Sequence, residues 1–76
     1  MTEQEWREEF AFKLRKAYRA RGYNQKQFAE EVGISEKTLS HYRRCIRTPD
    51  AITITNMAAV LDCDVSEIIP VGTIIK

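Results

Sequence analysis

The stretch that most constrains the fold is residues 24–47, which read NQKQFAEEVGISEKTLSHYRRCIR. Gly33 stands inside it, with the small Ala29 four residues earlier and Leu39 six residues later. Glycine often ends a helix because it adopts positive φ without a steric penalty. A small residue lets a second helix cross close by. We therefore predict two short helices joined by a tight turn.

Each of these helices has a recognisable start. Asn24 suits the N-cap of the first helix, and Gln27 completes a capping box three residues later. Ser35 suits the N-cap of the second helix, which we expect to cover about 36–44. Two short helices around such a turn are typical of a helix-turn-helix motif, whose second helix can enter the major groove of DNA.

The charge is uneven along the 76 residues, which we expect to form one small domain. The net charge is only +1, yet residues 1–10 sum to −3, residues 11–23 to +5 and residues 35–49 to +3. A chain of this kind can present a basic face while staying near neutral. The alternative is an ordinary solvated helix surface, which charge alone does not exclude.

Metal binding and membrane insertion find no support in the sequence. Cys45, Cys63 and His41 are too few and too poorly spaced for a zinc site, so we expect no metal and no cofactor. Two free thiols in a reducing cytosol are favoured over one disulfide. The absence of an apolar run near 18 residues and of a signal-peptide pattern predicts a soluble, cytoplasmic protein without a membrane partner.

The helix predicted for residues 3–21 begins with a capping box of Thr2 and Glu5 and stops at Gly22. Phe12 falls outside its apolar stripe and is either simply exposed or part of a contact surface. The stripe itself recurs at helical spacing and comprises Trp6, Phe10, Leu14, Ala17 and Tyr18.

The second helix of the motif has an inner and an outer face. Leu39 and Tyr42 point inward at an i, i+3 spacing. Its outer face combines cationic, carboxylate, hydroxyl and imidazole groups that can read base edges, and it consists of Glu36, Lys37, Ser40, His41 and Arg44. Polar helix faces are usually only solvated, and it is the preceding turn that favours base reading here.

Two patterns compete after Pro49. Residues 51–55, AITIT, alternate like a strand, but Ile54 begins an i, i+3, i+4, i+7 apolar face that continues to Leu61. We predict a helix from about 51 to 61 with Asp50 as its N-cap. A last short helix, capped by Asp64 or Ser66, is expected to place Val65, Ile68 and Ile69 in the core.

The chain is thus predicted to be all-α, with five helices in a domain over residues 1–69 and a short apolar tail over residues 70–76. The tail begins at Pro70 and reads PVGTIIK. Its β-branched residues suit an added strand or a dimer seam. The alternatives are a tail packed on its own domain and a disordered terminus.

The combined pattern resembles the phage repressor/Cro-like helix-turn-helix domains, also called xenobiotic-response-element regulators. The resemblance covers roughly residues 14–69. It rests on LRKAYRARGYNQKQFAEEVGISEKTLSHYRR, on Pro49 and on the later NMAAVLDCDVSEI. It implies five short helices around one core and binding to DNA.

The resemblance also implies roles for individual residues. Gln25 matches a glutamine that bonds a phosphate and braces the recognition helix. The leading positions of that helix are held by Ser35, Glu36 and Lys37, and His41 falls one turn later on the same side. Base contacts are therefore expected from Glu36, Lys37, Ser40 and His41, and phosphate contacts from Gln25, Ser35, Arg44 and Arg47.

Three positions depart from the family pattern. Tyr18 and Arg43 replace a common arginine–glutamate pair, and we expect them to stack instead. Cys45 stands where a glycine usually follows the recognition helix, which is unfavourable if positive φ is kept. Asp62 replaces another glycine but tolerates left-handed geometry better than most residues.

The expected function is that of a sequence-specific regulator of transcription that binds a double-stranded DNA operator. We expect a repressor that acts as a homodimer, whose subunits read half-sites about 34 Å apart. The alternative is a protein-interaction module, antitoxin-like or adaptor, which keeps the fold without sequence-specific DNA binding. An enzyme with a small-molecule substrate is not expected, because His41 has no nucleophile or carboxylate constellation around it in the sequence.

Overall fold

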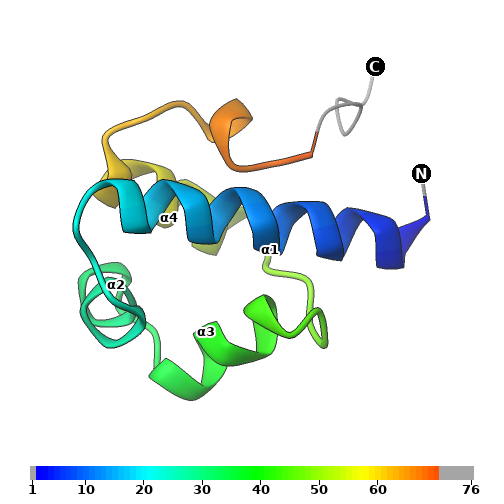
Figure 1. Cartoon of the computed structure of the whole chain (residues 1–76), viewed down its shortest axis with the longest axis horizontal. Coiled ribbons are helices and arrows are strands. Elements are labelled where there is room, and N and C mark those ends of the chain that lie inside the picture. The colour runs from blue at the N-terminus through cyan, green and yellow to red at the C-terminus, as the bar shows by residue number, and fades with distance from the viewer. Residues whose placement is uncertain (1, 71–76) are drawn as a thin grey trace.

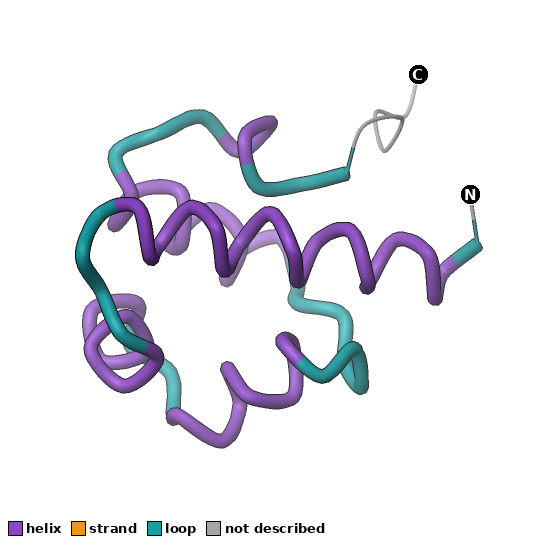
Figure 2. The backbone as a smooth tube through the Cα atoms, viewed as in Figure 1, coloured by secondary structure: helices purple, strands orange, loops and turns teal. Residues whose placement is uncertain are grey.

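The computed structural model describes residues 2–70. This part of the chain forms four α-helices and no strand, which confirms the all-α class for these residues. The elements are α1 (Glu3–Ala20), α2 (Gln25–Val32), α3 (Glu36–Arg43), α4 (Ala51–Leu61) and a 3-10 turn, η1 (Val65–Glu67). Helix α1 spans the molecule, with α2 and α3 on one side of it and η1 on the other (Figure 1). Figure 2 shows the loops that connect the helices.

The predicted starts of the helices are present as hydrogen bonds. Thr2 and Glu5 form a capping box at α1, and Asn24 and Gln27 form one at α2. The Ser35 hydroxyl accepts from the Thr38 amide at 3.0 Å and starts α3. These caps satisfy backbone N–H groups that no preceding helical turn can reach.

One face of every helix turns toward a shared core. In α1 the predicted stripe is confirmed, since Phe10, Leu14 and Tyr18 are buried and Trp6 and Ala17 pack against them. The rest of the core comes from α2, α3, α4 and the segment after η1, and comprises Phe28, Ala29, Val32, Leu39, Tyr42, Met57, Ala58, Leu61 and Ile68. Burying each large apolar side chain stabilises the fold by about 1.5–3 kcal/mol.

Helix α4 forms although its first residues carry the local pattern of a strand. Asp50 caps it through the Thr53 amide at 2.8 Å, as predicted. Met57 and Leu61 are fully buried, and Ile54 packs against the core. Preferences of single residues for strand span about 1 kcal/mol, whereas each buried apolar side chain contributes more. Burial of one helical face therefore decides this segment.

The predicted fifth helix is wrong as an α-helix. Residues 65–67 form only one 3-10 turn, in which the Glu67 carboxylate accepts from the Asp64 amide at 3.3 Å. Pro70 follows too soon for a longer helix, because proline has no N–H and disfavours helical geometry in the residue before it. The turn still places Ile68 in the core, as expected, and Pro70 is also buried.

The predicted strand in the tail falls on residues that the structure does not describe, except for Pro70. In residues 2–70, no helix is both long and apolar enough to cross a membrane.

Candidate nucleic-acid interface

The turn between α2 and α3 has the geometry that its sequence predicts. Gly33 has φ of 89°, a left-handed conformation that side chains other than glycine rarely adopt. The Ile34 amide donates to the Ala29 carbonyl at 3.0 Å, which closes the end of α2. An added Cβ at Gly33 would meet no neighbouring atom, so the backbone angle, not crowding, requires glycine here.

Helix α3 is held in the core by one side. Leu39 is 0% exposed and Tyr42 is 5% exposed. The opposite side carries the five polar residues predicted to face outward, which we call the reading face: Glu36, Lys37, Ser40, His41 and Arg44. Of these, Glu36, Lys37 and Arg44 are exposed, whereas Ser40 and His41 are half-buried. The structure thus brings the predicted base-reading residues onto one helix.

His41 is less available than the sequence suggests. Its Nδ1 atom is buried and makes no hydrogen bond within residues 2–70. A contact between His41 and a base is therefore limited to its other ring nitrogen, Nε2. The 3.6-residue period predicts which face of a helix a residue occupies, but it does not predict how far that residue is buried.

Gln25 joins the first turn of α2 to both ends of α3. Its side-chain N–H donates to the Glu36 carbonyl at 3.4 Å. Its side-chain oxygen accepts from the Arg43 guanidinium. Glu36 and Arg43 are the first and last residues of α3. A side-chain amide has two N–H groups, and the contact with Glu36 uses one of them.

The expected stack of Tyr18 on Arg43 is replaced by other contacts. The Tyr18 ring stacks on Phe28 with centroids 4.9 Å apart and planes 17° from parallel. Arg43 instead pairs with Gln25, and its Nε atom is buried without a hydrogen bond in the described part of the chain. Tyr18 and Phe28 are both buried in the core, whereas the Arg43 guanidinium bonds the side chain of Gln25 at the start of α2.

Ser35 is committed to the cap of α3. Its hydroxyl oxygen accepts from the Thr38 amide, and its hydroxyl proton is directed to Thr38 Oγ1 at 2.8 Å. Ser35 is nevertheless exposed at the start of the helix, where backbone N–H groups favour an anion. Thr38, which the sequence reading did not single out, thus organises this end of α3.

The loop from α3 to α4 is shaped by a left-handed residue. Cys45 has φ of 63°, and the Ile46 amide donates to the His41 carbonyl at 2.9 Å. The geometry of the family's glycine is therefore kept by a cysteine. Arg44 and Arg47 stand exposed in or next to this loop. Asp62 likewise has φ of 53° at the end of α4.

Arg7 anchors the same loop from a distance. Its guanidinium donates to Thr48 Oγ1 at 2.8 Å and forms an ion pair with Glu3 at 2.9 Å. Arg7 and Thr48 lie 41 positions apart in the chain. No local pattern links them, so sequence reasoning missed this contact.

Both cysteines are free thiols, as favoured by the sequence. Burial raises the pKa of Cys63 above its usual value, and the nearby Glu67 carboxylate acts in the same direction. Neither cysteine lies on the reading face.

The chain matches a model of a known protein family. The HTH_3 family model, described as helix-turn-helix, matches residues 13–68, which is more than half of the chain. No curated protein matches the chain significantly. The chain therefore belongs to the helix-turn-helix family of the phage repressor/Cro type, whose members are DNA-binding regulators of transcription.

Proposed function

We propose that this protein is a sequence-specific repressor that binds double-stranded operator DNA as a homodimer, with α3 in the major groove. The observation that carries the proposal is the position of α3. Leu39 and Tyr42 hold its inner side in the core, and Gln25 bonds its first and last residues. Its reading face is left outward on a helix whose orientation is fixed from both sides.

Lys37 and Glu36 are the leading candidates for base contacts. An exposed lysine donates to the O6 and N7 acceptors of guanine, and an exposed glutamate accepts from the cytosine amine. Ser40 and the Nε2 atom of His41 lie further along the helix and can adapt to either base edge. These contacts would set the sequence preference.

Phosphate contacts would set the register of α3 on the duplex. Gln25 and Ser35 lie near the starts of α2 and α3, where backbone N–H groups attract a phosphate. Arg44 and Arg47 are exposed beyond the end of α3 and would meet the backbone further along. Dimerisation supplies the contact area that one domain of this size lacks.

The proposal is tested by selecting binding sites from random duplex DNA and repeating the binding at two salt concentrations. We expect a two-fold symmetric site, with half-sites about 34 Å apart. Affinity should fall steeply with salt, because phosphate binding releases counterions. Recovery of no motif would contradict sequence-specific reading.

A protein-interaction module is the second candidate. The exposed Phe12 and Ile52 favour it, since they are 68% and 74% exposed. The Glu36 carboxylate at the start of the reading face would also repel the negatively charged phosphates of DNA, which favours a protein partner. Binding to a protein partner that does not weaken with salt, without any recovered DNA motif, would support this candidate over the first.

A further inference from the structure

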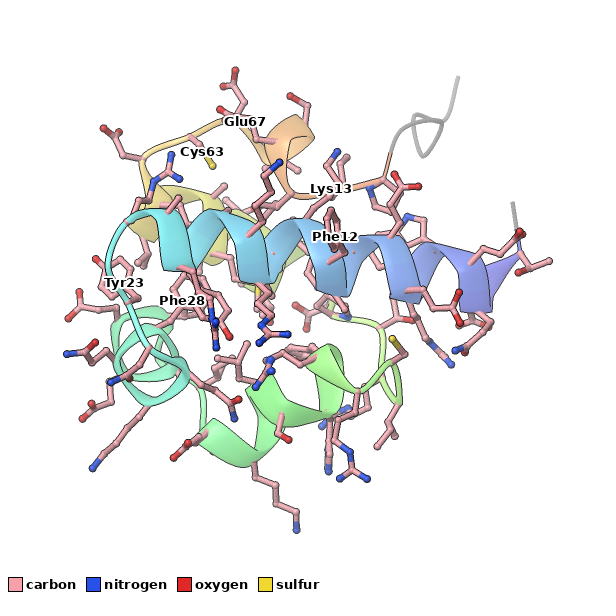
Figure 3. The ribbon with its side chains drawn as sticks, in the orientation of Figure 1. Phe12, Lys13, Tyr23, Phe28, Cys63 and Glu67 are labelled. Atoms are coloured by element: carbon pink, nitrogen blue, oxygen red, sulfur yellow. The ribbon has the colours of Figure 1, made fainter. Side chains whose placement is uncertain are left out.

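The outer face of α1 carries a line of exposed residues that the proposed function does not use. Helical residues advance by about 100° each, which places the whole line within about 60° of Phe12. The α1 stripe, as we call it, consists of Glu5, Glu8, Phe12, Arg15, Lys16 and Arg19, all exposed. Figure 3 shows Phe12 projecting toward the viewer from the middle part of α1.

The charges of the α1 stripe change sign at Phe12. Glu5 and Glu8 precede it, whereas Arg15, Lys16 and Arg19 follow it. Phe12 itself is 68% exposed and borders a shallow groove that is otherwise lined by the three cations. The stripe therefore has an acidic half, an apolar centre and a basic half.

The helix dipole explains only part of this order. It favours acids in the first turn and bases in the last turn, and its effect fades within those turns. Glu8, Arg15 and Lys16 lie further inside α1. Arg15 and Arg19 are also four positions apart, a spacing at which like charges repel within one helix. Within residues 2–70, neither arginine has an acidic partner that would offset this repulsion.

A second copy of the same helix complements the α1 stripe. When two copies of α1 lie antiparallel with Phe12 at the centre, each residue meets the one equally far on the other side of position 12. Glu8 then faces Lys16 of the second copy, and Glu5 faces Arg19. Each of these pairs occurs twice, and the two Phe12 rings meet at the two-fold axis.

We propose that the α1 stripe is a self-association surface through which two copies pair antiparallel about Phe12. This surface would be the interface of the homodimer in the proposed function. The inference rests on that function only in assigning the pair to DNA binding. Phe12 projects toward the viewer, so the second copy of α1 would lie in front of the first (Figure 3). The two-fold axis of the pair is perpendicular both to α1 and to the line that joins the two helices. It therefore points toward α3, which lies to one side of α1 (Figure 1). Both α3 helices then lie on the same side of the pair.

The expected association is weak. One helix face on each copy gives an interface at the low end of specific contacts, below about 1,200 Å² in total. Salt should weaken the association further, because the facing charge pairs are exposed to solvent. Self-association is therefore measured at high protein concentration and low salt, by sedimentation equilibrium of the full chain without DNA.

Charge reversal provides the test. Glu8→Lys replaces two attractive pairs by two repulsive ones, and so does Lys16→Glu. Each variant alone should associate at least about tenfold more weakly than the parent. An equimolar mixture of the two variants should recover association, because every facing pair is again of opposite charge. The double variant Glu8→Lys/Lys16→Glu should also recover it.

Matched controls carry the same charge changes away from the stripe. Glu31→Lys and Lys26→Glu alter exposed residues of α2 and should leave association unchanged. Thermal unfolding followed by circular dichroism verifies that every variant folds. Phe12→Ala should weaken association without lowering stability, since the ring is largely exposed.

Two outcomes overturn the proposal: a parent that stays monomeric at every concentration, and a variant mixture that associates no better than its components. Its failure is distinct from failure of the proposed function. A parent that binds DNA but never pairs through the stripe contradicts only the interface. A parent that pairs through the stripe but shows no salt-dependent DNA binding contradicts only the function.

Discussion

The Arg43 guanidinium donates a hydrogen bond to the side-chain oxygen of Gln25, and thereby links the end of α3 to the first residue of α2. Gln25 also donates to the carbonyl of Glu36, at the other end of α3. A single side chain thus fixes both ends of the helix that carries the reading face. Helix α3 is positioned by a polar clamp on one side and by the apolar core on the other.

Removing this clamp should loosen α3. Gln25→Ala deletes two hydrogen bonds and leaves a partly buried guanidinium without a partner, so we expect a loss of roughly 1–2 kcal/mol in the free energy of unfolding. DNA affinity should fall as well. Urea unfolding measures the first effect. The exposed Gln4→Ala serves as a control that changes stability by less than about 0.5 kcal/mol. An unchanged urea midpoint for Gln25→Ala would contradict the clamp.

Lys37→Ala tests base reading. Lys37 is exposed, so stability should stay nearly constant. We expect a loss of roughly 1–3 kcal/mol in binding at one base position and a relaxed preference there. The measurement is binding to the selected site and to its single-base variants. Glu31→Ala, at an exposed residue of α2 outside the reading face and the α1 stripe, is the control. If Lys37→Ala lowers affinity equally for all sequences, Lys37 binds phosphate and not a base.

Arg44→Ala tests a phosphate contact. The variant should weaken binding to all sequences alike and lower the slope of log affinity against log salt by about one. A salt titration on specific and random DNA gives both values. A loss confined to one base position would instead assign Arg44 to base reading.

Cys45→Gly should stabilise the protein. Cys45 has φ of 63°, a conformation in which a Cβ is unfavourable by roughly 1–2 kcal/mol. Glycine removes this strain but increases the entropy of the unfolded chain, so we expect a net gain of about 1 kcal/mol in unfolding free energy. Cys45→Ala keeps the Cβ and should bring no such gain. Equal unfolding midpoints for the glycine and alanine variants would refute the strain.

The cap of α4 should make stability depend on pH in the acid range. The hydrogen bond from the Thr53 backbone holds the pKa of Asp50 below its ordinary value of 3.8. A depressed pKa means that the unfolded chain binds the proton more readily. The contribution of the cap is therefore complete well above 3.8 and is lost as the pH falls through the lower pKa of the folded state.

Asp50→Asn isolates this effect, because asparagine is a good N-cap but does not titrate. Urea midpoints measured near about pH 6 and about pH 3 should fall more for the parent than for the variant. Equal losses would show that the acid sensitivity arises elsewhere, for example at Glu5, whose pKa is also lowered by its bond to the Thr2 backbone.

Much of the secondary structure follows from short-range chemistry and was predictable. Asn24, Ser35 and Asp50 each accept from an amide three residues later, so a local pattern contains both partners of the bond. Gly33 was predictable for a similar reason, because glycine is the residue type that readily adopts the positive φ found there. The family resemblance depends on these local signals and was confirmed by the match over residues 13–68.

The sequence by itself determined where α1 to α4 start and stop and which side of each is apolar. Tertiary structure decided the rest. Arg43 bonds Gln25, 18 positions away in the chain, while Tyr18 stacks on Phe28. Arg7 reaches Thr48 across 41 positions. Helix caps and the helical period involve residues three or four positions apart, so a sequence pattern contains both partners. The contacts of Arg43 and Arg7 form only after distant segments of the chain have packed together.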